Sequence, residues 1–136
     1  MTYAVSAALQ EAVYTALLED AEVAAALGGA VYDAIPTGTL PSIYVVLGTE
    51  DVRQANDKTG SGAVHRLVLS VITDAPGFRT AKQAAGAVCD VLHEADLTLS
   101  RGRLVSLIFQ RARAGKIDKG TGRKIDLTFR ARVEDN

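Results

Sequence analysis

Few side chains in this 136-residue sequence have the type and spacing that catalysis requires. The histidines are His65 and His93, and neither lies in a recognisable nucleophile motif. Ser61 lies between two glycines, but the surrounding residues do not form the Gly-x-Ser-x-Gly turn that presents a serine nucleophile in hydrolases. Because no oriented set of nucleophile and base is present, the sequence predicts a protein that is not an enzyme.

Two other patterns resemble ligand sites only in part. Cys89 and His93 lie four residues apart on a predicted helix and therefore share a face, but two ligands do not make a metal site. The segment 115–122 combines glycines with Lys116 and Lys119, yet it lacks the phosphate-loop pattern and precedes a predicted strand. A phosphate loop needs a helix N-terminus after it, so this segment predicts a basic hairpin turn. We expect no metal and no cofactor.

The charge of the chain is strongly divided along its length, although the net charge is only −1. Residues 1–100 contain five basic and twelve acidic residues, whereas residues 101–136 contain ten basic and four acidic ones. Such a division suits a protein with one acidic and one basic contact surface, including contacts between its own copies. A cationic hairpin that follows nucleic-acid phosphates is the alternative, although aromatic residues for base stacking are few, at 5% of the chain.

The cysteine content, the lengths of the apolar stretches and the N-terminal residues indicate the cellular compartment. A single cysteine excludes an intramolecular disulfide framework. No stretch approaches the roughly 18 consecutive apolar residues of a membrane-spanning helix, and the N-terminus lacks the basic region of a signal peptide. We therefore expect assembly in a reducing cytoplasm and no membrane partner.

Hydrophobic periodicity predicts two main helices. Apolar residues recur every four positions from Val5 to Leu17, and alanines with Val88 and Leu92 form one face of the segment 78–95. Between them, Asp20 is a plausible N-cap for a short helical segment that ends at two glycines, 28 and 29.

Alternating or β-branched residues predict the strands, and the polar segment 50–62 predicts a mobile hairpin tip. The whole chain, residues 1–136, is predicted to be one α+β domain. Its sheet is mixed but mostly antiparallel, has four or five strands, and carries the two main helices on one face. The predicted strands are 31–32, 42–48, 63–73, 104–113 and the alternating run 125–133.

The order of short motifs resembles the tail terminator, or tail completion, proteins of long-tailed phages and of gene transfer agents. The resemblance covers nearly the whole chain, and the series is more specific than any single piece. One departure is Val71-Ile72, where many members have an aromatic residue. The motifs that carry the resemblance are an Ala/Leu-rich N-terminal helix, 27–36 (LGGAVYDAIP), 40–48 (LPSIYVVLG), 65–71 (HRLVLSV), 78–82 (FRTAK), 102–105 (GRLV) and 129–131 (FRA).

The resemblance implies a structural virion protein with a tail-terminator-like fold. Such proteins form a homohexameric ring at the head-proximal end of the tail tube, stop tube polymerisation, and join the tail to the head-tail stopper protein. DNA passes through the ring without specific binding, and the particle is a phage virion or a gene transfer agent assembled in the bacterial cytoplasm. The competing function is a small nucleic-acid-binding module built on the basic hairpin.

Two polar segments are our candidates for contact with these partners. The segment around 50–62 is expected to contact the tail tube or the stopper, and the basic residues of 111–119 are expected to meet acidic patches of a neighbouring subunit. The candidate partner-binding residues are Glu50, Asp51, Arg53, Asn56, Asp57, Lys58, Arg111, Arg113, Lys116 and Lys119.

Overall fold

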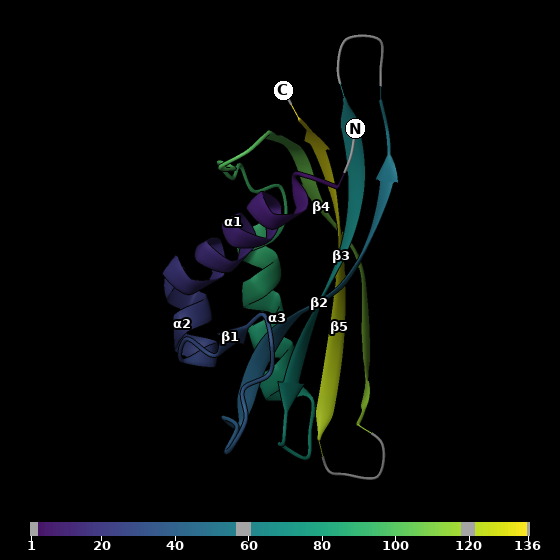
Figure 1. Cartoon of the computed structure of the whole chain (residues 1–136). Coiled ribbons are helices and arrows are strands. Elements are labelled where there is room, and N and C mark those ends of the chain that lie inside the picture. The colour runs from purple at the N-terminus through teal and green to yellow at the C-terminus, as the bar shows by residue number, and fades with distance from the viewer. Residues whose placement is uncertain (1–2, 57–60, 118–121, 136) are drawn as a thin grey trace.

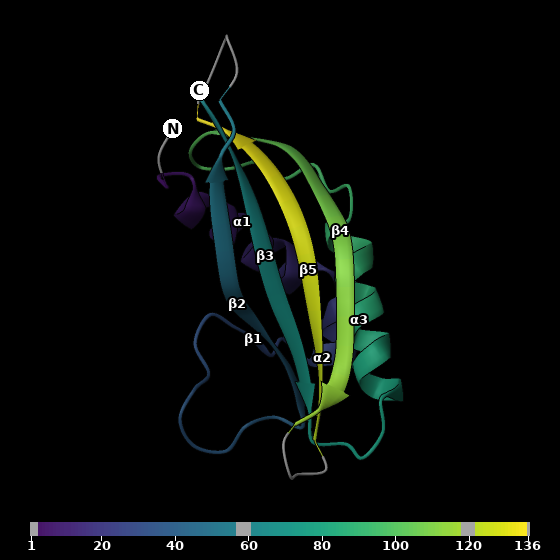
Figure 2. The same cartoon turned by 90° about the vertical axis from the view of Figure 1, so that its right-hand side faces the viewer.

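The structure, a computed structural model, describes residues 3–56, 61–117 and 122–135. Within these ranges the chain forms two layers, a five-stranded sheet and three helices that lie against one face of it (Figures 1 and 2). The strand order is β1-β2-β3-β5-β4, with β1 parallel to β2 and every other pair antiparallel. The predicted α+β fold with a mixed, mostly antiparallel sheet is confirmed.

The helices are α1 (Ser6–Glu19), α2 (Ala21–Leu27) and α3 (Arg79–Leu92). The side chain of Asp20 accepts a hydrogen bond from the Val23 amide at 3.0 Å, which caps α2 as expected. Gly28, with φ of 59°, ends that helix in the left-handed conformation. Among the described residues, no helix is long and apolar enough to cross a bilayer.

Helix α3 ends three residues before the predicted limit, residue 95, because the backbone turns toward the sheet. Glu94 has a positive φ of 60°, and its amide donates to the Leu107 carbonyl at 2.7 Å. This hydrogen bond links the end of the helix to the neighbouring strand, so the helical hydrogen-bond pattern stops at His93.

Two strands are longer than their sequence pattern predicts, because bulges interrupt the alternation. One irregularity falls between Leu47 and Glu50, and another between Phe109 and Arg111. Each bulge shifts the side-chain phase while pairing continues, so charged residues extend the strands beyond the apolar runs. The strands are β1 (Val31–Tyr32), β2 (Ile43–Gln54), β3 (Gly62–Thr73), β4 (Arg103–Lys116) and β5 (Arg123–Glu134).

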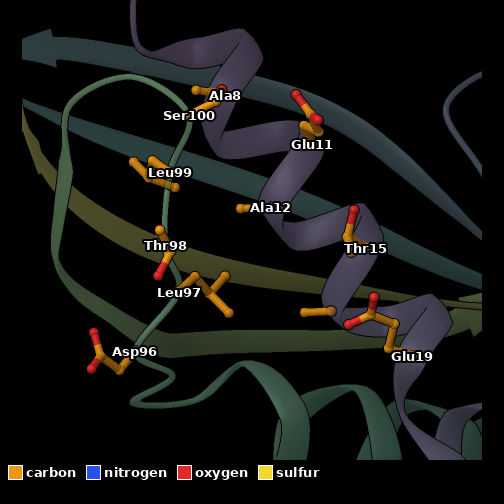
Figure 3. Close-up of a pocket in the computed structure, with 11 residues that line it drawn as sticks. Ala8, Glu11, Ala12, Thr15, Glu19, Asp96, Leu97, Thr98, Leu99 and Ser100 are labelled. Atoms are coloured by element: carbon orange, nitrogen blue, oxygen red, sulfur yellow. The ribbon is translucent and has the colours of Figure 1, made fainter.

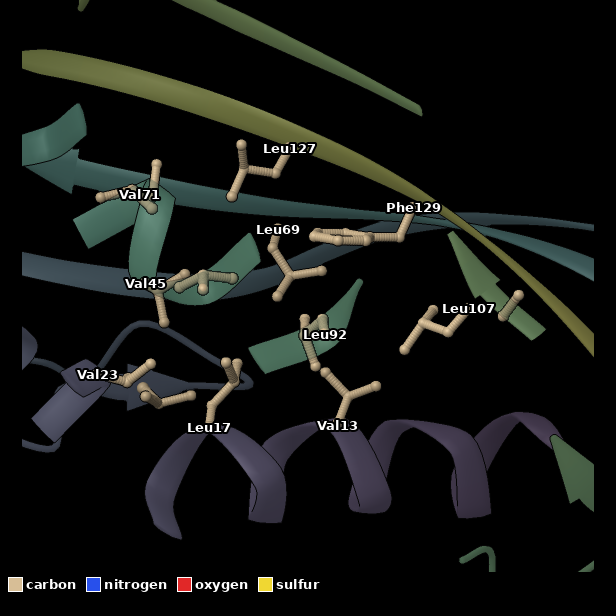
Figure 4. Packing of buried hydrophobic residues seen from close by; sticks show 14 of the residues in the cluster. Val13, Leu17, Val23, Val45, Leu69, Val71, Leu92, Leu107, Leu127 and Phe129 are labelled. Atoms are coloured by element: carbon tan, nitrogen blue, oxygen red, sulfur yellow. The ribbon is translucent and has the colours of Figure 1, made fainter. Parts of the chain in front are cut away.

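The core lies between the helices and one face of the sheet (Figure 4). Strand β5 alternates as predicted, with Ile125, Leu127, Phe129, Ala131 and Val133 buried against the helical layer. The Phe129 ring is fully buried and meets Phe109 edge to face, with 5.8 Å between ring centroids. Because the apolar phase of β5 faces the helices, its polar phase lies on the opposite, uncovered face.

The long strands give the sheet two distant ends. Gln54 pairs with Ala63 at one end, whereas Thr73 and Lys116 both pair with Arg123 at the other. The end of the sheet where β2 leads on to β3, at Gln54 and Ala63, therefore lies at one extreme of the molecule. The end where β4 leads on to β5, at Lys116 and Arg123, lies at the other (Figure 1).

Candidate partner-binding surfaces

The predicted partner-binding residues fall into two groups that the fold keeps apart. Glu50, Asp51, Arg53 and Asn56 lie at the end of β2 that is distant from Arg123, or just beyond that end. Strand β4 carries the second group, with Lys116 at the opposite end of the sheet. Arg111 and Arg113 occupy the same strand, whereas Asp57, Lys58 and Lys119 lie outside the described residues.

Glu50 is the member of the first group that is engaged inside the molecule. Its Oε1 accepts hydrogen bonds from Ser6 Oγ, at 2.5 Å, and from the Tyr3 hydroxyl. Its Oε2 lies 3.2 Å from Nδ1 of His65. We call these four residues the N-terminal clamp, because they fasten the start of α1 to strands β2 and β3.

The electrostatics of the clamp favour an ionised carboxylate. Burial alone raises the pKa of Glu50, but the hydrogen bonds from Ser6, Tyr3 and His65 outweigh it, and the pKa lies below its usual value. The ring of His65 is fully buried and stacks on Tyr3, with centroids 6.4 Å apart. Its Nε2 has no hydrogen-bond partner among the described residues, so Glu50 supplies the one polar contact that the structure gives the imidazole.

Sequence reasoning missed the clamp because its members come from three separate segments. The one available signal is the phase of β3: His65 occupies the same alternating positions as Ala63 and Leu69, which face the core. A histidine in that phase must find a partner for its ring nitrogens.

The other residues of the first group have different surroundings. Asp51 and Arg53 are exposed and form an ion pair at 3.4 Å, a contact that adds little stability at a surface. The Asn56 side chain accepts a hydrogen bond from the Gly62 amide at 3.1 Å and so closes the strand pair. Among the described residues of this group, Asp51 and Arg53 are thus the two charged side chains that face solvent.

The face of the sheet opposite the helices is uncovered (Figure 2). The strand register puts several basic residues on this face. Arg66 pairs across the strands with Arg130, and Arg111 pairs with Thr128 beside them. Within the described residues no ion pair neutralises these three arginines, although Arg66 Nε donates weakly to Gln110 at 3.4 Å. The basic sheet face is defined by Arg66, Arg111, Arg113, Lys124 and Arg130. Two carboxylates share it: Asp51 lies opposite Arg66, and Asp126 forms an ion pair with Lys124 at 3.6 Å.

The helical layer has the opposite charge and is hollowed by a groove of about 460 Å³ (Figure 3). The groove runs between α1 and the segment 96–100, and its floor consists of small or apolar residues, among them Ala12 and Leu97. Glu11, Glu19 and Asp96 lie at its rim, and the described residues offer none of them an ion pair. We call this hollow the acidic groove.

Cys89 and His93 share a face, as their spacing predicts, and line a small hollow with Asp90 and Phe109. His93 Nδ1 accepts a hydrogen bond from the Phe109 amide at 3.0 Å, so this nitrogen serves the fold. Burial and the nearby Asp90 carboxylate raise the pKa of the Cys89 thiol, which disfavours the nucleophilic thiolate. The described part of the chain contains no group of three or more side chains placed to hold a metal ion.

Comparison with known proteins identifies a family model and a solved structure that match this chain. The family model described as tail completion protein gp17 matches residues 11–134. A chain in a solved structure described as "Virion of native gene transfer agent (GTA) particle" is 62% identical and superposes with a TM-score of 0.93. That match covers 98% of this chain and 99% of the other. No curated protein matches the sequence.

Proposed function

The chain belongs to the family of tail completion protein gp17, and from this premise we propose that it caps the head-proximal end of a tail tube as a homohexameric ring. It is a structural tail protein of a phage-like particle, either a virion or a gene transfer agent. The ring ends polymerisation of the tube protein and provides the surface on which the head-tail stopper protein docks. DNA passes through the lumen without sequence-specific binding.

The observation that carries this proposal is the likeness, over nearly the full length, to a chain of a native gene transfer agent particle. At 62% identity and a TM-score of 0.93, the two chains share their fold and more than half of their aligned residues. The two distant ends of the sheet add support, because a ring placed between tube and stopper needs one contact surface on each side.

Deleting the gene for this chain in a producing cell tests the function directly. We expect tails of irregular length and heads without tails, because nothing then ends the tube or offers the stopper a docking surface. Electron microscopy of lysates measures both quantities, and expression of the intact chain in trans should restore them. Joined particles with tails of uniform length in the absence of the chain would contradict the proposal.

The exposed end of β2 is our candidate for contact with the tube or the stopper. Reversing the charge of Arg53 to give Arg53→Glu is expected to lower the yield of joined particles by about tenfold, because like charges facing each other across an interface weaken it. The matched control is Arg79→Glu, a charge reversal at another exposed position, on α3. The yield of joined particles is counted by electron microscopy. Equal yields from the two variants would remove Arg53 from the contact.

The basic sheet face supports the second candidate function, a nucleic-acid-binding module. Its arginines lack ion pairs in the described chain and could neutralise phosphates. Such binding would weaken steeply as salt concentration rises, because each neutralised phosphate releases counterions.

A further inference from the structure

We propose that the basic sheet face of one copy docks on the helical layer of the next copy, centred on the acidic groove. The inference rests on the proposed ring and identifies the surfaces that meet in it. It concerns residues that the ring proposal by itself does not assign, since Arg66, Arg130 and the groove carboxylates were not among the predicted contacts.

The first argument is that the basic sheet face is unfavourable when left bare. Arg66 and Arg130 are directly opposite each other on adjacent strands, and Arg111 lies on the next strand. Asp51 lies opposite Arg66 on the other side, but it forms its ion pair with Arg53. Like charges at paired positions destabilise a sheet. Half-buried Val68 and Ile108 point to the same uncovered face, so the surface also offers apolar area. A covering layer of opposite charge relieves the repulsion and buries these side chains.

The second argument is that the chain itself carries the complementary surface. The helical layer presents exposed carboxylates for which the described residues provide no ion pair, whereas its exposed cations are Arg79 and Lys82. The division of charge along the sequence thus becomes a division between the two layers. These unpaired carboxylates are Glu11, Glu19, Glu22, Asp90 and Asp96.

The third argument concerns the shape of the acidic groove. Its floor of alanines leaves room for long side chains, and its apolar surface suits the methylene stem of an arginine (Figure 3). The rim carboxylates of Glu11, Glu19 and Asp96 would then meet the guanidinium groups in charge-assisted hydrogen bonds.

The two surfaces lie on opposite layers of the molecule, so the contact is heterologous. Each copy uses its sheet toward one neighbour and its helices toward the other. A contact of this kind continues from copy to copy, and the rotation between neighbours determines whether the chain of copies closes into a ring.

The test is a pair of charge-swapped full-length chains expressed in the producing cell. Arg66→Glu/Arg111→Glu makes the sheet face acidic, and Glu11→Lys/Glu19→Lys makes the groove basic. Each variant alone brings like charges together, and we expect the yield of joined particles to fall by at least about tenfold. Co-expression of the two variants restores opposite charges at every contact between unlike copies, and we expect it to recover the yield.

Arg79→Glu/Lys82→Glu is the matched control, because it reverses two exposed cations on α3 that do not line the acidic groove. It should leave the yield unchanged. Thermal unfolding of each purified variant establishes that the substitutions leave the fold intact. The readout counts particles, so it is informative even where the isolated chain does not associate in solution.

Three outcomes would overturn the inference. Normal yield from both single-face variants would show that these surfaces do not meet. Loss in both without recovery on co-expression, from folded chains, would show that the surfaces contact something other than each other. In the third outcome, co-expression does not restore the yield of joined particles, and Arg66→Glu/Arg111→Glu also loses salt-sensitive binding to labelled duplex DNA. That result would identify a polyanion as the occupant of the basic sheet face. None of the three outcomes contradicts the tail-capping function, because deletion of the gene tests that function separately.

Discussion

Replacing Glu50 by alanine is expected to lower the free energy of unfolding by about 2–3 kcal/mol, mainly because His65 loses its polar partner. The ring is fully buried, and its Nε2 already lacks a partner among the described residues. Without the Glu50 carboxylate, Nδ1 is unpaired as well, and Ser6 and Tyr3 lose their shared acceptor. Urea unfolding followed by circular dichroism measures the change.

The charge of Glu50 adds a pH dependence whose direction follows from its lowered pKa. A carboxylate with a lower pKa in the folded state than in the unfolded state stabilises the fold at pH values above the unfolded value, here 4.5. That stabilisation disappears as the pH falls through the folded value. Glu50→Gln keeps the size of the side chain but cannot ionise, so its stability should fall less between neutral and acidic pH.

The control for this pair is Asp51→Asn, which removes an exposed carboxylate from the adjacent position. Its profile of stability against pH should follow that of the wild-type chain. If Glu50→Gln and the wild-type chain lost stability in parallel as the pH fell, the carboxylate of Glu50 would not be the group responsible.

Substituting alanine for Gly102 is expected to destabilise the fold by about 2–4 kcal/mol, through strain and a steric clash together. Gly102 has φ of 72°, in the left-handed region that favours glycine. A Cβ there would lie 2.6 Å from the Glu134 carbonyl oxygen and 3.0 Å from a methyl group of Val5. Backbone blocks one side and a buried side chain the other, so the loop must move.

Gly86 provides the matched control, because it lies within α3 and a Cβ there meets nothing within 4 Å. Gly86→Ala should stabilise the chain by about 0.5–1 kcal/mol, since alanine favours the helix. Thermal unfolding of the two variants should therefore shift the midpoint in opposite directions. A neutral Gly102→Ala would mean that the loop before β4 relaxes at low cost.

How much of the fold is predictable follows from particular elements. Some elements are determined by their local pattern, because the pattern marks the face that becomes buried. These are α1, with Leu9, Val13 and Leu17 four residues apart, and β5, with its strict alternation. The limits of β2 and β4 were not predictable in this way. Bulges at Leu47/Glu50 and Phe109/Arg111 shift the phase, and the strands continue because partner strands supply the hydrogen bonds.

The candidate contact residues show the same division. The sequence identifies charged segments, but it does not say that the β2 and β4 groups lie at opposite ends of one sheet. Nor does it reveal that Glu50 turns inward to Ser6, Tyr3 and His65, since these positions are up to 62 residues apart (Tyr3 to His65) and meet through strand pairing.

The sequence alone determined the fold class, the family resemblance and the division of charge, because periodicity, motif order and residue type are local properties of a chain. The tertiary structure alone decided which charges share a surface. Strand register places Arg66 beside Arg130, although 64 positions separate them, and the packing of α1 beside 96–100 brings three carboxylates to one groove. Long-range pairing makes these surfaces, and it depends on contacts that no sequence window contains.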